Sequence, residues 1–386
     1  MTSPTSSAET WDLVVVGAGP AGATAALAAL RQRPDLRVLL LDRAAFPRDK
    51  CCGDGIAPHV LDVLHPLGAA DVVDGWEPVR DLGLSRGHQQ VTGRMVRPVW
   101  VVPRAVLDAR LVGHAVAAGA ELRQHRVREV EQRPDGVRVD DVLGRVVVAA
   151  DGAHSVVRRR LTRGRAPRRA LAVRGYTPTT AARRARQEIR YGERRQPSYA
   201  WSFDRGDGWS NVGYGELVDA DDPPTRRLLL DQLELLLPGS APDGRDWLGH
   251  HLPLSGWGWG REQPDGRVLL AGDAAGLVNP MTGEGIYYAV ATGALAGRTA
   301  ADSLSGGHDE SAGARHRAAV RRRLDRHLRH TSAAARLSRH PAIVGAGIVA
   351  ARRDQRHFDS LVELGLGDGR ITPRLAAGLA AGLMSS

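Results

Sequence analysis

The sequence is poor in cysteine, in lysine and in long apolar runs. Its two cysteines are neighbours, Cys51 and Cys52, so they cannot build the disulfide framework that small secreted proteins use. No apolar stretch reaches the roughly 18–20 residues that a membrane-spanning helix needs, and no secretory signal segment is predicted. We therefore expect a cytoplasmic protein, with loose attachment to the inner face of the membrane as the alternative.

Arginine carries almost all of the positive charge. The formal net charge is +10, and Lys50 is the single lysine. A surface rich in arginine can be solvated without any specific partner. It can also bind an anionic lipid or a diphosphate. The arginine-rich windows offer little of the interleaved aromatic surface on which nucleic-acid bases stack. We expect no nucleic-acid partner, and we predict no metal site.

Residue types with AT-rich codons are also scarce. A GC-rich coding sequence would explain their scarcity. Phe, Lys, Asn, Ile and Tyr together number 18, yet eleven of them fall in the segments 46–56, 199–215 and 272–288. These segments hold 45 of the 386 residues, so even scatter would place about two there. Side chains kept against such a bias indicate where chemistry demands them.

A strand, a glycine turn, a helix and a second strand are predicted in succession at residues 12–16, 17–22, 20–33 and 37–42. In the turn, Gly17 permits the tight bend, Gly19 lets backbone approach a pyrophosphate, and Gly22 lets the helix pack on the strand. Pro20 and Ala21 complete the motif. Asp42, followed by Arg43, ends the second strand where its carboxylate can accept the hydroxyls of an adenosine ribose. This pattern predicts a dinucleotide cofactor without separating FAD from NAD.

Two later motifs favour FAD. Asp151-Gly152-Ala153-His154-Ser155-Val156-Val157-Arg158 and Gly272-Asp273-Ala274-Ala275-Gly276 each follow a predicted strand. They resemble the paired flavin motifs of the p-hydroxybenzoate hydroxylase superfamily over most of residues 10–305. The resemblance implies that Asp273 binds the ribityl hydroxyls and that Arg104 reaches the pyrophosphate, with Asp151 and Gly272 in the same site. Turn and surface roles are the alternatives for Asp273 and Arg104.

A third glycine-rich segment, Asn279-Pro280-Met281-Thr282-Gly283-Glu284-Gly285-Ile286, leads into a helix predicted over 284–300. Backbone N–H groups at Gly283, Gly285 and Ile286, together with the helix dipole, would stabilise negative charge at the N1–O2 edge of reduced flavin. A plain helix cap is the alternative.

Two segments narrow the resemblance further. Lys50-Cys51-Cys52-Gly53-Asp54-Gly55 resembles the lysine-x-cysteine-glycine stretch of the geranylgeranyl reductase family. Tyr199-Ala200-Trp201-Ser202-Phe203 with Gly213-Tyr214-Gly215 is similar to that family's substrate-domain signature, although Asp204 stands where the family has proline. The resemblance implies Cys52 and Lys50 as catalytic residues and Gly53 as a cofactor contact. It implies substrate contacts at Tyr199, Trp201, Phe203, Tyr214 and Pro280.

The chemistry of these side chains leaves alternatives open. We expect Lys50 to lower the pKa of Cys52 and make it a proton donor or a redox-sensitive thiol, whereas a buried inert cysteine is the alternative. Tyr199, Trp201 and Phe203 should share one face of a strand and line an apolar tunnel, or else form ordinary core.

The predicted fold class is α/β, or α+β overall. It combines a Rossmann-type FAD-binding domain, an antiparallel β-rich substrate domain and a C-terminal helical segment broken by Pro341, Gly345 and Gly347. We expect a discontinuous flavin domain over 10–78, 101–168 and 262–305, a substrate domain over 79–100 and 169–261, and a helical region over 306–386.

The implied function is FAD-dependent reduction of a carbon–carbon double bond in a hydrophobic isoprenoid or polyene substrate. Hydride would come from N5 of reduced flavin and a proton from a protein acid or water. A flavin monooxygenase or halogenase, and a non-catalytic prenyl-binding chaperone, are the alternatives. Because one dinucleotide fingerprint is visible, electrons would come from transiently bound NAD(P)H, or from a small redox protein such as a reductase or a ferredoxin-like donor.

Overall fold

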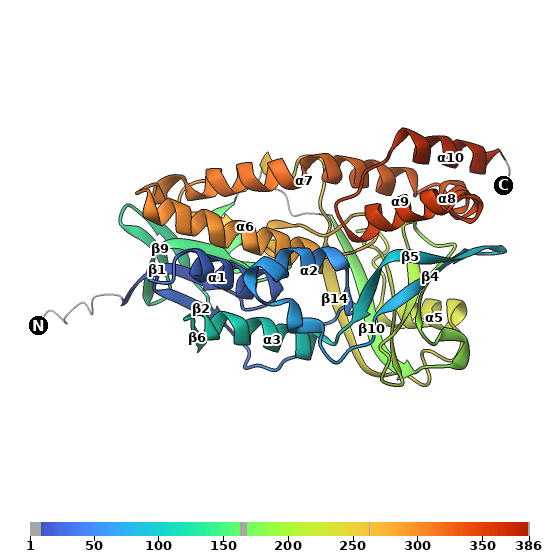
Figure 1. Cartoon of the computed structure of the whole chain (residues 1–386), viewed down its shortest axis with the longest axis horizontal. Coiled ribbons are helices and arrows are strands. Elements are labelled where there is room, and N and C mark those ends of the chain that lie inside the picture. The colour runs from blue at the N-terminus through green and yellow to red at the C-terminus, as the bar shows by residue number, and fades with distance from the viewer. Residues whose placement is uncertain (1–8, 163–167, 262, 385–386) are drawn as a thin grey trace, which may run out of the picture.

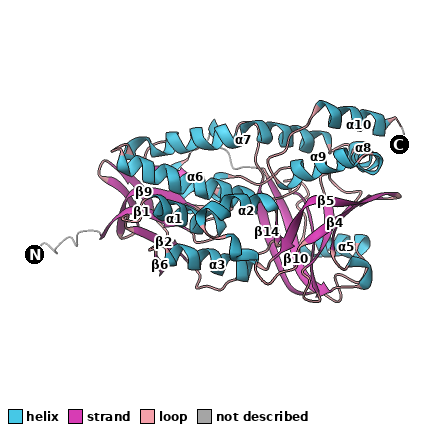
Figure 2. Cartoon of the chain, viewed as in Figure 1, coloured by secondary structure: helices cyan, strands magenta, loops and turns pink. Residues whose placement is uncertain are grey.

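The computed structural model describes residues 9–162, 168–261 and 263–384. The strands gather in two regions at opposite ends of an elongated molecule, and α7 with the C-terminal helices runs along the upper edge of both (Figure 1, Figure 2). The predicted limits of the flavin domain include residues 163–167 and 262, which lie outside the described ranges.

The first sheet contains the predicted strand–turn–helix–strand unit. Its order is β6-β2-β1-β9-β8-β7, and β15 pairs with β9. β1 is parallel to β2 and β9, whereas β7 and β8 form an antiparallel extension. The strands are β1 (Glu9–Val16), β2 (Val38–Asp42), β6 (Glu121–Gln124), β7 (Val130–Arg133), β8 (Gly136–Val139), β9 (Val142–Ala149) and β15 (Val268–Leu270). β2 is buried throughout, which explains its nearly continuous apolar sequence.

Two helices of this half, α1 and α6, pack closely against each other because small residues line their contact. A Cβ added at Gly293 of α6 (Ile286–Ser305) would lie 2.2 Å from the carbonyl oxygen of Ala21 in α1 (Pro20–Gln32). The same holds for Gly297, at 2.1 Å from the Ala25 oxygen. The other helices of this half are α2 (Pro58–Leu64), α3 (Arg104–Ala117), α4 (Val156–Leu161) and α7 (Ala312–Leu337).

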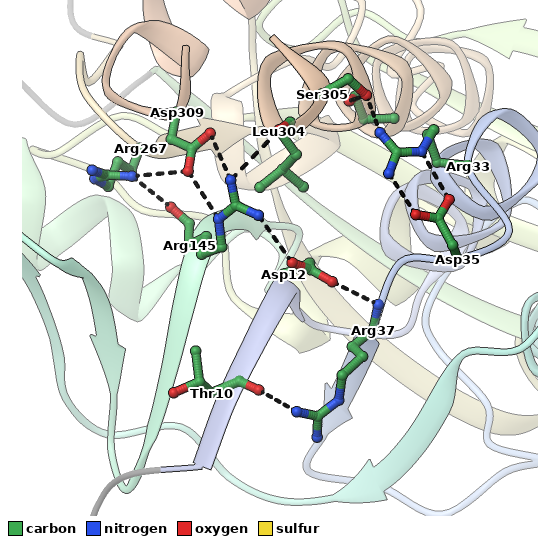
Figure 3. Close-up of polar contacts among 11 residues, drawn as sticks. Thr10, Asp12, Arg33, Asp35, Arg37, Arg145, Arg267, Leu304, Ser305 and Asp309 are labelled. Carbon is green, nitrogen blue, oxygen red and sulfur yellow. Dashed lines mark hydrogen bonds and ion pairs between the residues drawn. The ribbon is translucent and has the colours of Figure 1, made fainter. Parts of the chain in front are cut away.

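An ion-pair network joins β1 and β9 to the connection between α6 and α7 (Figure 3). Arg145 of β9 lies 3.2 Å from Asp12 of β1 and 3.1 Å from Asp309. Arg267, just before β15, reaches the same Asp309 carboxylate at 3.2 Å. Since Arg145 is 40% exposed, we expect a modest stabilisation that fixes the order of the elements.

The second sheet has the order β14-β10-β13-β12-β11-β4-β5-β3. It is antiparallel except for β4 and β11, whose parallel pairing differs from the predicted antiparallel sheet. The reason is connectivity, since the chain passes through the first sheet between these strands, and parallel neighbours need such a long crossover. The strands are β3 (Gly55–Ile56), β4 (Val79–Arg86), β5 (Gln89–Val101), β10 (Arg169–Pro178), β11 (Arg186–Tyr191), β12 (Tyr199–Asp204), β13 (Trp209–Leu217) and β14 (Arg245–Pro253).

The two faces of this sheet have different partners. Leu229 and Leu233 of α5 (Arg226–Leu236) pack on the face that carries Val212 and Tyr214. The opposite face lies toward the C-terminal helices, and Phe358 of α9 is buried against side chains of β4 and β5.

The C-terminal helices are α8 (Pro341–Arg353), α9 (Gln355–Leu366) and α10 (Pro373–Leu383). Pro341 stands in the first turn of α8, where its missing N–H costs nothing. The prediction that Gly345 and Gly347 break the helix is wrong, because both lie inside α8. A Cβ at Gly345 would lie 2.2 Å from Oε1 of Gln89, so glycine there allows α8 to approach β5 closely. None of the described helices is long and apolar enough to cross a membrane.

Candidate active site

A cavity of about 910 Å³ extends from the glycine turn after β1 to the C-terminal helices. Segments that are far apart in the sequence line it, including residues 48–53, 150–154, 278–286 and the strand β12. Every predicted site residue lines this cavity except Gly22, Gly272 and Tyr214. The structure therefore brings the separate flavin and substrate motifs together in one place.

The three exceptions have separate causes. Gly22 has the predicted packing role, because a Cβ there would lie 1.8 Å from the carbonyl oxygen of Gly17. Gly272 has a left-handed φ of +57° and donates its N–H to Oγ1 of Thr292, so it shapes the turn that carries Asp273, and its cofactor contact stays a prediction. Tyr214 pairs with Ala200 across the strands and lies on the α5 face of the sheet, so the substrate contact predicted for it is wrong.

The glycine turn leaves room and donors for a diphosphate. A Cβ at Gly17 would lie 2.4 Å from the carbonyl oxygen of Ala150, so the turn is tight. Gly19 stands at the N-cap of α1 and has no side chain to accept the first N–H groups of the helix. A Cβ there would lie 3.3 Å from Nη2 of Arg48 and 3.9 Å from Nη2 of Arg104. Free N–H groups beside two guanidinium groups fit the pyrophosphate of a dinucleotide.

A buried carboxylate holds both arginines. Arg104 is 4% exposed and binds Asp108 through Nε at 2.7 Å and Nη2 at 2.8 Å. Nη1 of Arg48 lies 3.0 Å from the same carboxylate. Arg104 is therefore not a surface arginine. The sequence reading missed Arg48 and Asp108, although Asp108 stands one helical turn after Arg104, where such pairs form.

Asp42 and Asp151 flank the turn at the ends of β2 and β9. Oδ2 of Asp42 accepts the Ala18 N–H at 2.8 Å, which fixes the carboxylate against the turn. Oδ2 of Asp151 accepts the Val156 N–H at 2.6 Å and so caps α4. Its Oδ1 is buried without a partner among the described residues, and burial raises the pKa of this carboxyl. An unpaired buried oxygen in the cavity wall fits a hydroxyl or N–H of a bound cofactor.

Lys50 and Asp273 meet across the cavity. Nζ of Lys50 lies 3.1 Å from Oδ2 of Asp273. Burial alone would raise the pKa of Asp273, but the nearby ammonium outweighs it and holds the pKa below its ordinary value. Burial and the same ammonium lower the pKa of His250 to about 4, so this imidazole is neutral at pH 7.

The thiols behave differently from the sequence-based expectation. Burial raises the pKa of Cys52 despite the attraction of Arg104, and it raises the pKa of Cys51 to about 12. The predicted lowering by Lys50 is wrong, because its ammonium is paired with Asp273 and loss of hydration dominates at the sulfur. Both thiols are therefore protonated at neutral pH.

A buried polar network supports the loop that carries Cys52. Asp54 has a left-handed φ of +59°, and its Oδ2 accepts from Oη of Tyr176 at 2.7 Å and Nδ2 of Asn211 at 2.8 Å. Nδ2 of Asn211 also donates to the Cys52 carbonyl at 2.8 Å, and its Oδ1 accepts from Nε1 of Trp201 at 2.8 Å. Asn211 thus connects the aromatic strand to the cysteine loop. The sequence analysis assigned Asn211 no role, although asparagine is scarce in the chain and the position of Asn211 in segment 199–215 was a signal.

The aromatic strand forms one wall of the cavity. Tyr199, Trp201 and Phe203 lie on one face of β12, with ring centroids 6.0 and 6.4 Å apart in sequence order. Oη of Tyr199 donates to the Thr282 carbonyl, which joins this wall to the loop before α6.

The loop before α6 is held from behind by the end of α9. Nδ2 of Asn279 donates to the Leu364 carbonyl at 3.1 Å, and Oγ1 of Thr282 donates to the Gly365 carbonyl at 2.8 Å. Oε1 of Glu284 accepts the Tyr287 N–H at 2.8 Å, and burial raises the pKa of Glu284 to about 7. Glu284 lines the cavity between the two predicted glycines, but the sequence reading gave it no role.

Within the described ranges, no group of three or more His, Cys, Asp or Glu side chains is arranged to hold a metal ion. The charged groups of the cavity instead gather around the glycine turn and around Lys50, which suits an organic dinucleotide.

Comparison with known proteins identifies the class. Residues 10–180 match the family model described as FAD binding domain. The chain is 36% identical over 316 residues to the menaquinone reductase of Mycolicibacterium smegmatis, covering 74% of this chain and 75% of that protein. It is 33% identical over 333 residues to digeranylgeranylglycerophospholipid reductase 1 of Methanopyrus kandleri, covering 76% and 81%. A geranylgeranyl bacteriochlorophyll reductase-like protein from Thermoplasma acidophilum has the same fold, with a TM-score of 0.79, 18% identity and 96% coverage of each chain.

The chain is thus an FAD-dependent oxidoreductase with the predicted mixed α/β fold. Within that class, it belongs to the geranylgeranyl reductase family.

Proposed function

We propose that this protein hydrogenates a carbon–carbon double bond in the isoprenoid chain of a hydrophobic substrate, such as a prenylated quinone or a geranylgeranyl lipid. The observation that carries the proposal is an apolar chamber between the aromatic strand and the C-terminal helices. The names of the two sequence relatives, a menaquinone reductase and a digeranylgeranylglycerophospholipid reductase, support this substrate class.

The chamber suits a chain that has nothing to hydrogen-bond. Its walls come from β4, β11, α8, α9 and α10, and the residues that define it are Leu82, Leu84, Ile189, Ile348, Leu361 and Leu375. Gln187 and Tyr191 of β11 are the polar side chains that these strands add to the lining. An alkyl chain gains about 25 cal/mol for each Å² removed from water, so burial alone can hold a prenyl tail here.

The chain's own residues would orient the reaction and supply a proton. Reduced FAD, when bound, supplies the hydride. Trp201 and Tyr199 hold the alkene against the loop before α6. The Gly283 N–H donates to the Asn279 carbonyl at 2.9 Å, so Gly285, at the N-cap of α6, is the glycine whose N–H can favour negative charge here. Sγ of Cys52 holds a proton at neutral pH, so we propose it as the donor to the second carbon. Lys50 positions Asp273 by its ion pair.

The electron donor belongs to the same proposal. The fingerprint at Gly17 serves FAD, so NAD(P)H would bind transiently, or a small redox protein would deliver electrons. Either donor would reduce the flavin, so the choice between them does not change the product.

An anaerobic single-turnover assay tests the function. Dithionite-reduced enzyme is mixed with a prenylated quinone or a geranylgeranyl lipid, and flavin reoxidation is followed at 450 nm. The mass of the product is measured by mass spectrometry. Flavin reoxidation with a gain of two hydrogens supports the proposal. A product heavier by oxygen in air, with no anaerobic reoxidation by any alkene, would instead show a monooxygenase on the same fold.

A further inference from the structure

The last helix has an apolar outer face. On α10, Leu375, Gly378 and Gly382 are buried against the molecule, whereas the alanines at 376, 377 and 380 are exposed. At its end, Leu383 is 42% exposed and Met384 is 83% exposed. Figure 1 shows α10 at the outer edge of the molecule, on the side away from α5. An exposed run of this kind usually marks an interaction site.

The apolar chamber reaches the surface beside this face. Its lining includes Leu337 at the end of α7, Ile343 at the start of α8 and Leu379 of α10. Leu337 is 48% exposed, so the cavity wall continues onto the outside of the protein. Nδ1 of His330 accepts the Ile371 N–H at 3.2 Å, which holds the beginning of α10 next to α7 at this mouth.

Arginines lie on and between the helices around this opening of the apolar chamber. Five exposed arginines lie at the end of α7, in the connection to α8, on α8 and on α10: Arg336, Arg339, Arg352, Arg353 and Arg374. Across the described residues, none of the five forms an ion pair with a carboxylate, and α10 itself carries no acidic residue. Nη1 of Arg353 donates to the Ala381 carbonyl at 3.3 Å, which places this guanidinium at the end of α10.

We propose that Leu337, Ala376, Ala377, Ala380, Leu383 and Met384 form a docking face for a bilayer rich in anionic lipid, through which the prenyl substrate enters the chamber. The inference rests on the proposed function for the identity of the substrate. Apolar side chains enter the boundary between headgroups and acyl chains, while the arginines stay at the level of the phosphates. A tail leaving the bilayer at Leu337 then passes into the apolar chamber without crossing water.

Charge favours a bilayer over a second copy of this chain. A symmetric dimer through the docking face would bring the arginines of both copies together without carboxylates to neutralise them. The phosphates of an anionic lipid surface can instead neutralise the charges of these arginines.

Vesicle flotation of the FAD-loaded full chain tests the face. The wild type should float with phosphatidylcholine vesicles containing 30% phosphatidylglycerol and much less with phosphatidylcholine alone. The double variant Leu383→Glu with Met384→Glu should bind at least tenfold more weakly, and Arg374→Glu about fivefold more weakly. Matched changes on α5, Leu235→Glu (71% exposed) and Arg226→Glu, should bind like the wild type. Unchanged FAD content in every variant shows that each has folded.

Absence of wild-type binding to the anionic vesicles, or equal binding by the α10 and α5 variants, would overturn the docking face. A second arm separates this result from the proposed function. With substrate in detergent micelles the α10 variants should turn over like the wild type, and with substrate in vesicles they should be slow. Vesicle binding that depends on α10, without reduction of any prenyl substrate in micelles, would leave the docking face standing and remove the proposed reaction.

Discussion

Nζ of Lys50 lies 3.1 Å from Oδ2 of Asp273, although 223 residues separate them in the chain. The pair joins the cysteine loop to the turn after β15, and it holds the pKa of Asp273 below its ordinary value against the effect of burial. The single lysine of the sequence therefore stands where an ammonium is needed to keep a buried carboxylate charged.

Lys50→Met should reduce the free energy of unfolding by about 1–3 kcal/mol at pH 7, because it leaves the Asp273 carboxylate without its partner. A depressed pKa in the folded state stabilises above the unfolded pKa, and this contribution is lost as the pH falls below about 3.8. The loss is complete only below the lowered folded-state pKa, so urea unfolding should show a smaller difference between variant and wild type at pH 3 than at pH 7. A matched change in an exposed pair, Arg227→Met, should cost under about 0.5 kcal/mol at either pH. Equal differences at both pH values for Lys50→Met would contradict the coupling.

Glu284→Gln should change how stability depends on pH. The folded-state pKa of about 7 lies above the ordinary 4.5, so the folded protein favours the protonated carboxyl. The resulting stabilisation is complete below pH 4.5 and is lost as the pH rises through 7. The wild type should lose about 1–3 kcal/mol between pH 5 and pH 8 that the glutamine variant keeps. Parallel melting-temperature profiles for the two proteins would show that Glu284 titrates normally.

Cys52→Ser should slow reduction of the prenyl substrate and leave FAD bound, whereas Cys51→Ser should have a much smaller effect. Sγ of Cys51 donates toward the Leu248 carbonyl at 3.3 Å, so it is engaged with the second sheet. Because burial raises the pKa of both thiols, neither should react with a disulfide reagent at pH 8 until the protein is unfolded. Rapid reaction of either thiol in the folded protein would show an exposed thiolate.

Asp42→Ala should weaken FAD binding by about 1.5–3 kcal/mol, because it removes charge-assisted hydrogen bonds to the adenosine ribose. FMN has no adenosine, so its affinity should change far less. Fluorescence titration of both flavins measures the difference. Asp35→Ala, which removes an exposed carboxylate beyond the end of α1, is the control and should leave FAD affinity unchanged.

Trp201→Phe and Tyr214→Phe distinguish the two faces of the second sheet. Trp201→Phe removes the N–H that Oδ1 of Asn211 accepts, so KM for the prenyl substrate should rise several-fold without loss of FAD. Tyr214→Phe removes a hydroxyl that donates to Oε2 of Glu216 at 3.1 Å, and Tyr214 itself does not line the cavity. It should leave KM unchanged. A rise in KM for Tyr214→Phe as well would contradict the assignment of substrate binding to the Trp201 face of the sheet alone.

Local patterns predicted the fold because they depend on neighbouring residues. The βαβ unit follows from Gly17, Gly19 and Gly22 between two apolar strands, and alternation on β12 set Tyr199 and Trp201 on one face. The parallel pairing of β4 with β11 could not be read in this way, because it depends on the path of the chain through another sheet.

The supporting residues of the site were harder to predict. Asn211 and Arg48 act through contacts with residues more than 50 positions away, which no local pattern encodes. The prediction of a lowered pKa for Cys52 was wrong for a related reason. The sequence shows that Lys50 is near, but it does not show that the ammonium of Lys50 is paired with Asp273. Tyr214 was misplaced because a motif records that an aromatic is present, but only the register shows which way it points.

The contacts between the loop before α6 and the end of α9 have a consequence for engineering. Asn279 and Thr282 donate to the main-chain carbonyls of Leu364 and Gly365, so the attachment depends on the backbone of α9 and not on its side chains. On the helical side of the chamber, residues 343–379 supply most of the lining, and Leu337 of α7 stands at the mouth. A chimaera that exchanges this stretch for that of a relative can therefore alter the length of tail that is accepted while the flavin side keeps its geometry. Under the proposed function, the preferred length of the prenyl tail and the flavin chemistry would be set by separate segments of the chain.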